Sequence, residues 1–140
     1  MTKRRVLFLC THNSARSQMA EGFLRYLAGD RFDVESAGTE ETRVNPLAVL
    51  VMGEVGVDLS GHRSKTLDRF LDQAWDHVIT VCDHANERCP VFPRGAARLH
   101  WSFEDPSCAT GTEEERLAVF RRIRDEIGAR IKSWLTDPRP

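Results

Sequence analysis

The sequence predicts an α/β fold: a four-stranded parallel twisted sheet with helices on both faces. Two observations predict it. Short apolar runs alternate along the chain with segments in which apolar residues recur at helical spacing. A polar loop also joins the first apolar run directly to the first helical segment. Strands that alternate with helices form right-handed βαβ units, which make the sheet parallel and cover both of its faces.

The first half of the chain supplies two strands and two helices. The expected elements are a strand at residues 6–10, a helix at 17–28, a strand at 32–37 and a helix at 45–55. The first strand is continuously apolar, and the first helix places Met19, Phe23 and Leu27 on one face. Asn45 and Pro46 mark the start of the second helix, because Asn is a favoured N-cap and Pro fits the first helical position.

The second half continues the alternation. The expected elements are a short helix at residues 64–72, strands at 78–82 and 97–101, and a long final helix that begins at residue 112. Thr112 and Glu115 form a capping box at the start of that helix. Its buried stripe is expected to comprise Leu117, Phe120, Ile123, Ile127, Ile131 and Leu135. With no repeat or linker in its 140 residues, the chain is expected to form one domain over residues 1–140.

The loop after the first strand has the chemistry of an oxyanion site. Five small or polar residues separate Cys10 from Arg16, and none of them is acidic. Backbone N–H groups and the helix N-terminus attract an anion, and an arginine holds two of its oxygens. The same field lowers the pKa of a cysteine, so we expect a thiolate at Cys10, where the alternative is a buried strand-end thiol. The expected anion-binding residues are Thr11, His12, Asn13, Ser14, Ala15, Arg16 and Ser17.

The segment from Cys82 to Arg88 repeats the spacing from cysteine to arginine. It contains Asp83 and Glu87, which repel an oxyanion, so we interpret the repeat as a coincidence. Cys82 ends the third strand and is therefore expected at the same edge of the sheet as the anion loop.

Cys82 and Cys89 allow three interpretations. They are two unrelated thiols, or a zinc site with His84 that lacks a clear fourth ligand, or a resolving pair that passes oxidation away from Cys10 by thiol–disulfide exchange. A helical segment between them would separate their Cα atoms by about 10 Å. Because a disulfide spans at most about 7 Å, closing that bond would require the segment to unwind.

Asp105 and Pro106 follow the fourth strand. An acid at that edge of the sheet can protonate a departing oxygen, although an Asp-Pro pair by itself is more often a turn.

Taken together, these motifs resemble the low-molecular-weight tyrosine phosphatase fold, and Cys82 with Cys89-Pro90 is similar to the thioredoxin-coupled arsenate reductases built on it. The resemblance covers nearly the entire chain. Its further motifs are Arg16 to Gly22, Ser36-Ala37-Gly38, Asn45-Pro46, His100-Trp101, Phe103, Asp105-Pro106 and Arg124 to Ile127. The tyrosines that the phosphatases often carry after Asp-Pro are replaced here by Ser107 and Cys108, the latter interpreted as an incidental thiol.

The resemblance implies the reduction of arsenate to arsenite by three cysteines. Cys10 attacks arsenate held by Arg16, Asp105 protonates the leaving oxygen, Cys82 attacks Cys10, and Cys89 closes a Cys82–Cys89 disulfide that thioredoxin reduces. Asn13 is expected to shape the loop and Ser17 to donate to the Cys10 thiolate. No metal or organic cofactor is expected. The alternatives are a phosphatase acting on phosphotyrosine or small phosphoesters, and a redox sensor or oxyanion-binding protein without turnover.

Lys65 departs from the family pattern. Family members that bind potassium beside the loop use an Asn, a Ser and a downstream acid; Asn13 and Ser36 match, but Lys65 stands where the acid is expected. Lys65 is interpreted either as a fixed positive charge beside Asn13 and Ser36 or as a solvated surface lysine.

The composition of the chain indicates which classes of partner and which compartment are expected. A net charge of −1 does not indicate nucleic acid or a membrane as the main partner, and no apolar run is long enough to span a bilayer. The four cysteines suit a reducing compartment better than a disulfide framework, so a cytoplasmic protein is expected. The expected partners are arsenate, with phosphate or sulfate as competing oxyanions, and thioredoxin, and the protein is expected to be a monomer.

Overall fold

The computed structural model describes residues 3–40, 42–82 and 96–136. Its elements in chain order are β1 (Arg4–Cys10), α1 (Arg16–Ala28), β2 (Phe32–Gly38), α2 (Pro46–Glu54), η1 (Leu67–Phe70), β3 (His77–Thr80), β4 (Ala97–His100), η3 (Pro106–Cys108) and α4 (Glu113–Thr136). The predictions for Cys89 and for the zinc alternative at His84 lie outside the described residues.

Within the described residues, the strands form one parallel sheet in the order β2-β1-β3-β4. β1 lies inside the sheet, and its residues from Val6 to Cys10 are all buried. Because the strands are parallel, their carboxyl ends meet at one edge. Cys10 pairs there with Gly38, and the backbone N–H of Val81 donates to the carbonyl oxygen of Leu9 at 2.8 Å. The sheet edge therefore brings the segments around Cys10 and Cys82 side by side, as predicted.

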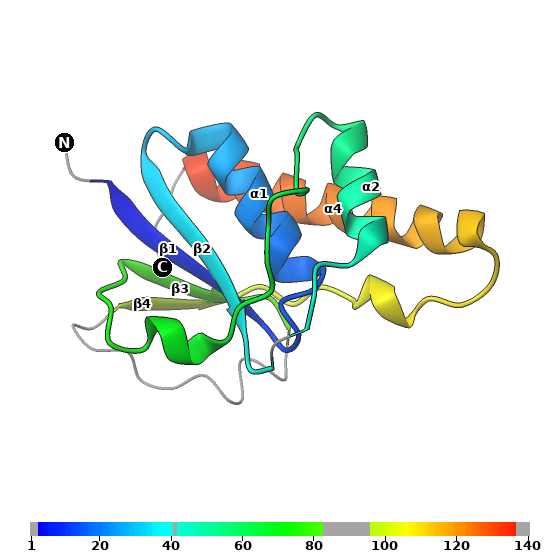
Figure 1. Ribbon diagram of the computed structural model, residues 1–140. Coiled ribbons are helices and arrows are strands. Elements are labelled where there is room, and N and C mark those ends of the chain that lie inside the picture. Colours follow the sequence, from blue (N-terminus) through cyan, green and yellow to red (C-terminus); the bar gives the residue numbers. More distant parts are fainter. Residues whose placement is uncertain (1–2, 41, 83–95, 137–140) are drawn as a thin grey trace.

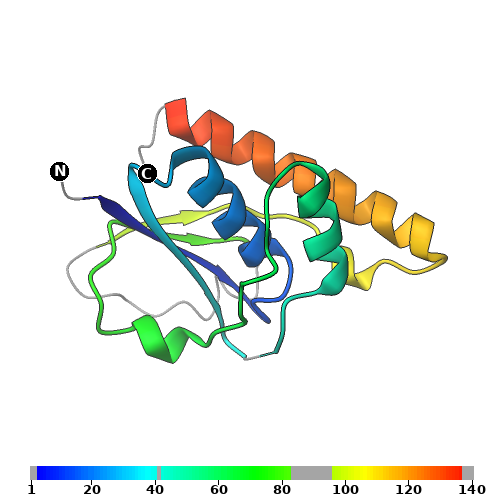
Figure 2. The ribbon, with the colours of Figure 1, turned by 45° about the horizontal axis from the view of Figure 1, so that its top comes forward.

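The helices α1, α2 and α4 gather on one side of the sheet, and η1 lies on the other (Figures 1 and 2). α1 and α4 approach closely, since a Cβ atom on Gly128 would lie 3.1 Å from the ring of Phe23. The predicted parallel sheet with helices on both faces is confirmed, with the short helix η1 on the second face. No helix in the described ranges combines the length and apolar character needed to cross a membrane.

The helix predicted over residues 64–72 is much shorter than expected. Only Leu67–Phe70 is helical, in a single 3-10 turn. The preceding residues pair instead with the end of β2: the backbone N–H of Gly38 donates to the carbonyl oxygen of Lys65 at 2.8 Å, and Gly38 forms a parallel bridge with Thr66. This extended pairing excludes a helix at Lys65 and Thr66.

The capping box of α4 is confirmed. The backbone N–H of Glu115 donates to Thr112 Oγ1 at 3.1 Å, and that of Thr112 donates to Glu115 Oε1 at 3.2 Å. The expected stripe is buried from Leu117 to Ile131, whereas Leu135 is only partly buried. Trp134, which the prediction missed, is buried against the rings of Phe32, His77 and Trp101.

Candidate active site

The loop between Cys10 and α1 lies at the carboxyl edge of the sheet, at the N-terminus of a 13-residue helix. Ala15 occupies the N-cap position and supplies no side-chain acceptor to the first N–H groups of α1. Such a helix start attracts an anion, because its N–H groups carry partial positive charge and need acceptors. Ser17 lies one residue inside the helix rather than at its cap.

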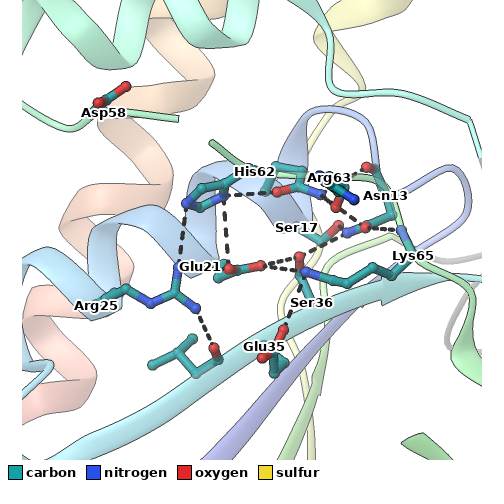
Figure 3. Close-up of polar contacts among 12 residues, drawn as sticks. Asn13, Ser17, Glu21, Arg25, Glu35, Ser36, Asp58, His62, Arg63 and Lys65 are labelled. Atoms are coloured by element: carbon teal, nitrogen blue, oxygen red, sulfur yellow. Dashed lines mark hydrogen bonds and ion pairs between the residues drawn. The ribbon is translucent and has the colours of Figure 1, made fainter. Parts of the chain in front are cut away.

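Asn13 fixes the shape of this loop. Its φ of 50° lies in the left-handed region, and its side chain is fully buried. Nδ2 donates to Ser17 Oγ at 2.8 Å and to Ser36 Oγ at 2.9 Å. Oδ1 accepts from Gln18 Nε2 at 2.9 Å and from the backbone N–H of Lys65 at 2.8 Å (Figure 3). One side chain thus ties the loop to α1, β2 and the segment before η1.

Cys10, the last residue of β1, is in hydrogen-bonding contact with Cys82, which was predicted to end the third strand but lies two residues beyond the end of β3 at Thr80. Both are buried thiols, and the Thr11 hydroxyl lies 3.3 Å from Cys82 Sγ. The hydrogen bond with Cys82, followed by burial, raises the pKa of Cys10 well above its usual value, although Arg16 and the backbone N–H of His12 act in the opposite direction. The expected lowering of the Cys10 pKa is therefore wrong for this arrangement, because the hydrogen bond with Cys82 and burial outweigh the charge of Arg16 and the backbone N–H of His12.

Arg16 and Asp105 complete the pocket. Arg16 Nη1 donates to the carbonyl oxygen of Phe103 at 3.0 Å, and Nη2 lies 3.5 Å from Asp105 Oδ2. The Arg16 Nε atom is buried and has no hydrogen-bond partner among the described residues, so a donor is available to an oxyanion. The pocket is lined by Cys10, His12, Ser14, Ala15, Arg16, Asp105 and Ser107.

Asp105 is held as a carboxylate in this arrangement. Burial alone would raise its pKa, but hydrogen bonds from Ser107 and the charge of Arg16 outweigh burial and lower the pKa below its usual value. Cys108 is exposed, with its Sγ 3.7 Å from Asp105 Oδ2.

Sequence reasoning missed two buried polar residues behind the loop, Gln18 and Glu21. Gln18 Nε2 donates to the carbonyl oxygen of Arg63 at 2.8 Å, and Glu21 accepts from Ser36. The sequence gives no signal of this burial, because Gln18, Glu21 and Arg25 lie at helical spacing in a polar stripe, which is typical of the solvent-facing side of a helix. The candidate site therefore comprises a pocket around Cys10 and a buried polar network beneath it.

Gly38 provides a test of how tightly this loop is held. A Cβ atom at Gly38 would lie 2.6 Å from the carbonyl oxygen of Thr11 and 2.8 Å from the backbone nitrogen of Asn13, so Gly38→Ala must displace the loop backbone. We expect a loss of about 1–3 kcal/mol in the free energy of unfolding, with weaker sulfate binding. Urea unfolding and calorimetric titration with sulfate measure the two effects. Gly53→Ala is the control, because nothing lies within 4 Å of its Cβ; equal behaviour of the two variants would contradict the close contact.

The chain is similar in sequence and in fold to several known proteins. Residues 5–138 match the family model of the low molecular weight phosphotyrosine protein phosphatases. An arsenate reductase of Halalkalibacterium halodurans is 53% identical over 134 residues, which cover 96% of each chain. An arsenate reductase solved in its phosphate-binding state is 34% identical with a TM-score of 0.77, over 95% of this chain and 97% of that one. A thioredoxin-dependent arsenate reductase of Corynebacterium glutamicum is 31% identical with a TM-score of 0.76, over 96% of this chain and 61% of that one.

Proposed function

The chain belongs to the low molecular weight phosphotyrosine protein phosphatase family, among the arsenate reductases built on that fold, and from this premise we propose that it reduces arsenate through a relay of Cys10, Cys82 and Cys89. The contact between Cys10 and Cys82 is the observation that carries the proposal. A phosphatase needs one thiol in its oxyanion loop, whereas a reductase needs a second sulfur within reach of the first.

Binding of the oxyanion comes first. Arsenate enters the loop, where the α1 N-terminus attracts it and Arg16 Nε, which has no hydrogen-bond partner among the described residues, is available as a donor. The anion also competes with Asp105 for the Arg16 guanidinium. Asp105 then loses part of its counter-charge and gains a negative neighbour, and both changes raise its pKa. Substrate binding thus prepares Asp105 to carry a proton.

The first covalent step joins Cys10 Sγ to arsenic. The thiol proton of Cys10 passes to an arsenate oxygen, and the resulting thiolate attacks the arsenic atom. Asp105 then donates a proton to the departing arsenate oxygen, and that oxygen leaves as water. This step involves no oxidation or reduction, and arsenic remains pentavalent.

The second step carries the redox chemistry. The Cys82 thiol passes its proton to an oxygen on arsenic and attacks Cys10 Sγ; the sulfur–arsenic bond breaks, and its electron pair remains on arsenic. Arsenic leaves as trivalent arsenite, and the two sulfurs, oxidised by two electrons, form a disulfide. Cys89 then attacks Cys82 and releases Cys10. A dithiol partner reduces the resulting Cys82–Cys89 disulfide; the Corynebacterium glutamicum relative is described as thioredoxin-dependent, so we assign this role to thioredoxin.

A coupled assay tests this function. Purified protein, thioredoxin, thioredoxin reductase and NADPH are mixed, and NADPH oxidation is followed after arsenate is added. We expect one NADPH to be consumed for each arsenite formed. Turnover of an aryl phosphate without arsenate-dependent NADPH oxidation would support the phosphatase alternative.

Asp105→Asn is expected to slow the first covalent step by about a hundredfold or more, because an amide cannot supply the proton that the departing oxygen needs. Binding of sulfate should change little. A rapid-quench single turnover with arsenate measures the rate, and calorimetry measures sulfate affinity. Glu104→Gln is the control, since Glu104 is an exposed neighbour paired with Arg122. A single-turnover rate equal to that of the unmodified protein would reduce Asp105 to a turn residue.

A further inference from the structure

Behind the oxyanion loop, the buried carboxylate of Glu21 is surrounded by basic side chains (Figure 3). Glu21 is only 2% exposed. Its Oε1 accepts from Ser36 Oγ at 2.5 Å and lies 3.3 Å from Lys65 Nζ. Its Oε2 lies 2.8 Å from Arg25 Nη1 and 3.7 Å from His62 Nδ1. Each neighbour is a donor or a cation, so the network is built around a carboxylate anion.

Lys65 is the most enclosed permanent cation of this group. The Arg25 side chain is 45% exposed and also donates to the carbonyl oxygen of Val34, so solvent screens it. Burial lowers the pKa of His62, and its Nδ1 lies closer to Gln18 Oε1, at 2.9 Å, than to Glu21. The Lys65 side chain is only 12% exposed, and its Nζ lies between Glu21 Oε1 and Glu35 Oε1, at 3.3 and 3.2 Å. The interpretation of Lys65 as a solvated surface lysine is therefore wrong.

A chain of directed hydrogen bonds connects this ammonium to the oxyanion loop. The Ser36 hydroxyl donates a hydrogen bond to Glu21, so Ser36 Oγ acts as the acceptor for Asn13 Nδ2. This direction requires the Asn13 amide to present Nδ2 to Ser36 and Oδ1 to the backbone N–H of Lys65. Lys65 thus reaches Asn13 twice, through its own backbone and through Glu21 and Ser36.

We propose that Lys65 is a positioning residue for the oxyanion loop, a monovalent cation built into the chain that fixes Glu21 and, through Ser36, the orientation of Asn13. It touches neither substrate nor reacting atoms. Without the ammonium, the buried carboxylate loses its most enclosed cation and shifts toward Arg25, the permanent cation that remains, so that the acceptor that orients Ser36 is displaced. The inference concerns binding of any tetrahedral oxyanion and does not depend on arsenate being reduced.

Lys65→Met tests the charge while keeping most of the apolar stem. We expect sulfate to bind about tenfold to a hundredfold more weakly, as for other residues that orient a ligand shell, and Lys65→Arg to retain most of the affinity. Calorimetric titration with sulfate measures the affinity, and circular dichroism establishes that each variant is folded. Lys3→Met is the matched control, because Lys3 pairs with Asp33 at 3.9 Å on the surface, where both side chains are exposed. Affinity of Lys65→Met equal to that of Lys3→Met would overturn the proposal.

Lys65→Ala separates a positioning cation from general loss of packing. Removal of the side chain opens a space next to Glu21, Ser36 and Asn13, whose oxygen atoms suit a small cation. Potassium or ammonium chloride should restore much of the sulfate affinity, whereas choline chloride at equal ionic strength should not. In the unmodified protein, exchange of sodium for potassium should change neither activity nor melting temperature. The proposal would be contradicted if neither potassium nor ammonium restored the sulfate affinity of Lys65→Ala, or if choline restored it equally. A change in the activity or melting temperature of the unmodified protein with potassium would also contradict it.

Discussion

Cys10→Ser is expected to lower the rate of arsenate reduction, and of any hydrolysis of aryl phosphates, by about a thousandfold or more. A serine hydroxyl is protonated at neutral pH even beside Arg16, so it is a poor nucleophile. Its oxygen also cannot form a disulfide with Cys82. The loss should therefore affect both the attack on arsenic and the later disulfide step. The coupled NADPH assay and an aryl phosphate assay measure the two activities.

Two controls make the Cys10→Ser result specific. Sulfate affinity should stay close to that of the unmodified protein, because the loop, Asn13 and Arg16 are unchanged. Cys108→Ser removes an exposed thiol near Asp105 and should leave turnover almost unaffected. Retention of either activity near its original level by Cys10→Ser would remove Cys10 from the mechanism.

Substitution of the other two cysteines should arrest the reaction at different stages. Cys89→Ser is expected to reduce one arsenate per molecule and then stop as a Cys10–Cys82 disulfide, since those two sulfurs are already in contact. Cys82→Ser should stop one step earlier, with arsenic still attached to Cys10 and no arsenite released. Both variants should lose steady-state turnover almost completely, because no route regenerates Cys10.

Peptide mapping of acid-quenched single turnovers distinguishes these stages. The Cys10–Cys82 crosslink should accumulate in Cys89→Ser and be absent from Cys82→Ser, while arsenite analysis should find about one equivalent and none, respectively. Sustained thioredoxin-linked turnover by Cys89→Ser would refute the relay as proposed.

The order of strands and helices follows from the sequence because it depends on short-range patterns. The continuously apolar run after Arg5 and the capping box at Thr112 are local signals, and both are confirmed. The helix predicted around Lys65 is largely absent for the opposite reason. Its backbone is held extended by Gly38, a partner 27 residues away along the chain, and no local propensity reports such pairing.

The candidate site likewise has some features that the sequence predicts and others that depend on contacts between distant segments. The sequence predicts that Cys10, Arg16, Cys82 and Asp105 meet, because each ends or follows a strand of one parallel sheet or starts the adjoining helix. The structure places Cys10, Arg16 and Asp105 around one pocket and Cys82 beside Cys10. The raised pKa of Cys10 was not predictable, since it depends on the distance between two sulfurs from separate strands. The burial of Glu21 is likewise not predictable, because a glutamate on a helix is usually solvated, and here β2 and the segment with His62 and Lys65 enclose it.

The most direct test of the central claim is a count of thiols after a single exposure to arsenate without any reductant. Unmodified protein is denatured and titrated with a thiol reagent before and after arsenate, and arsenite is measured in the same samples, with phosphate in place of arsenate as the control. The relay predicts the loss of two thiols for each arsenite released and no loss with phosphate. Arsenite release without thiol loss, or no change with arsenate at all, would contradict the assignment of this chain as a cysteine-dependent arsenate reductase.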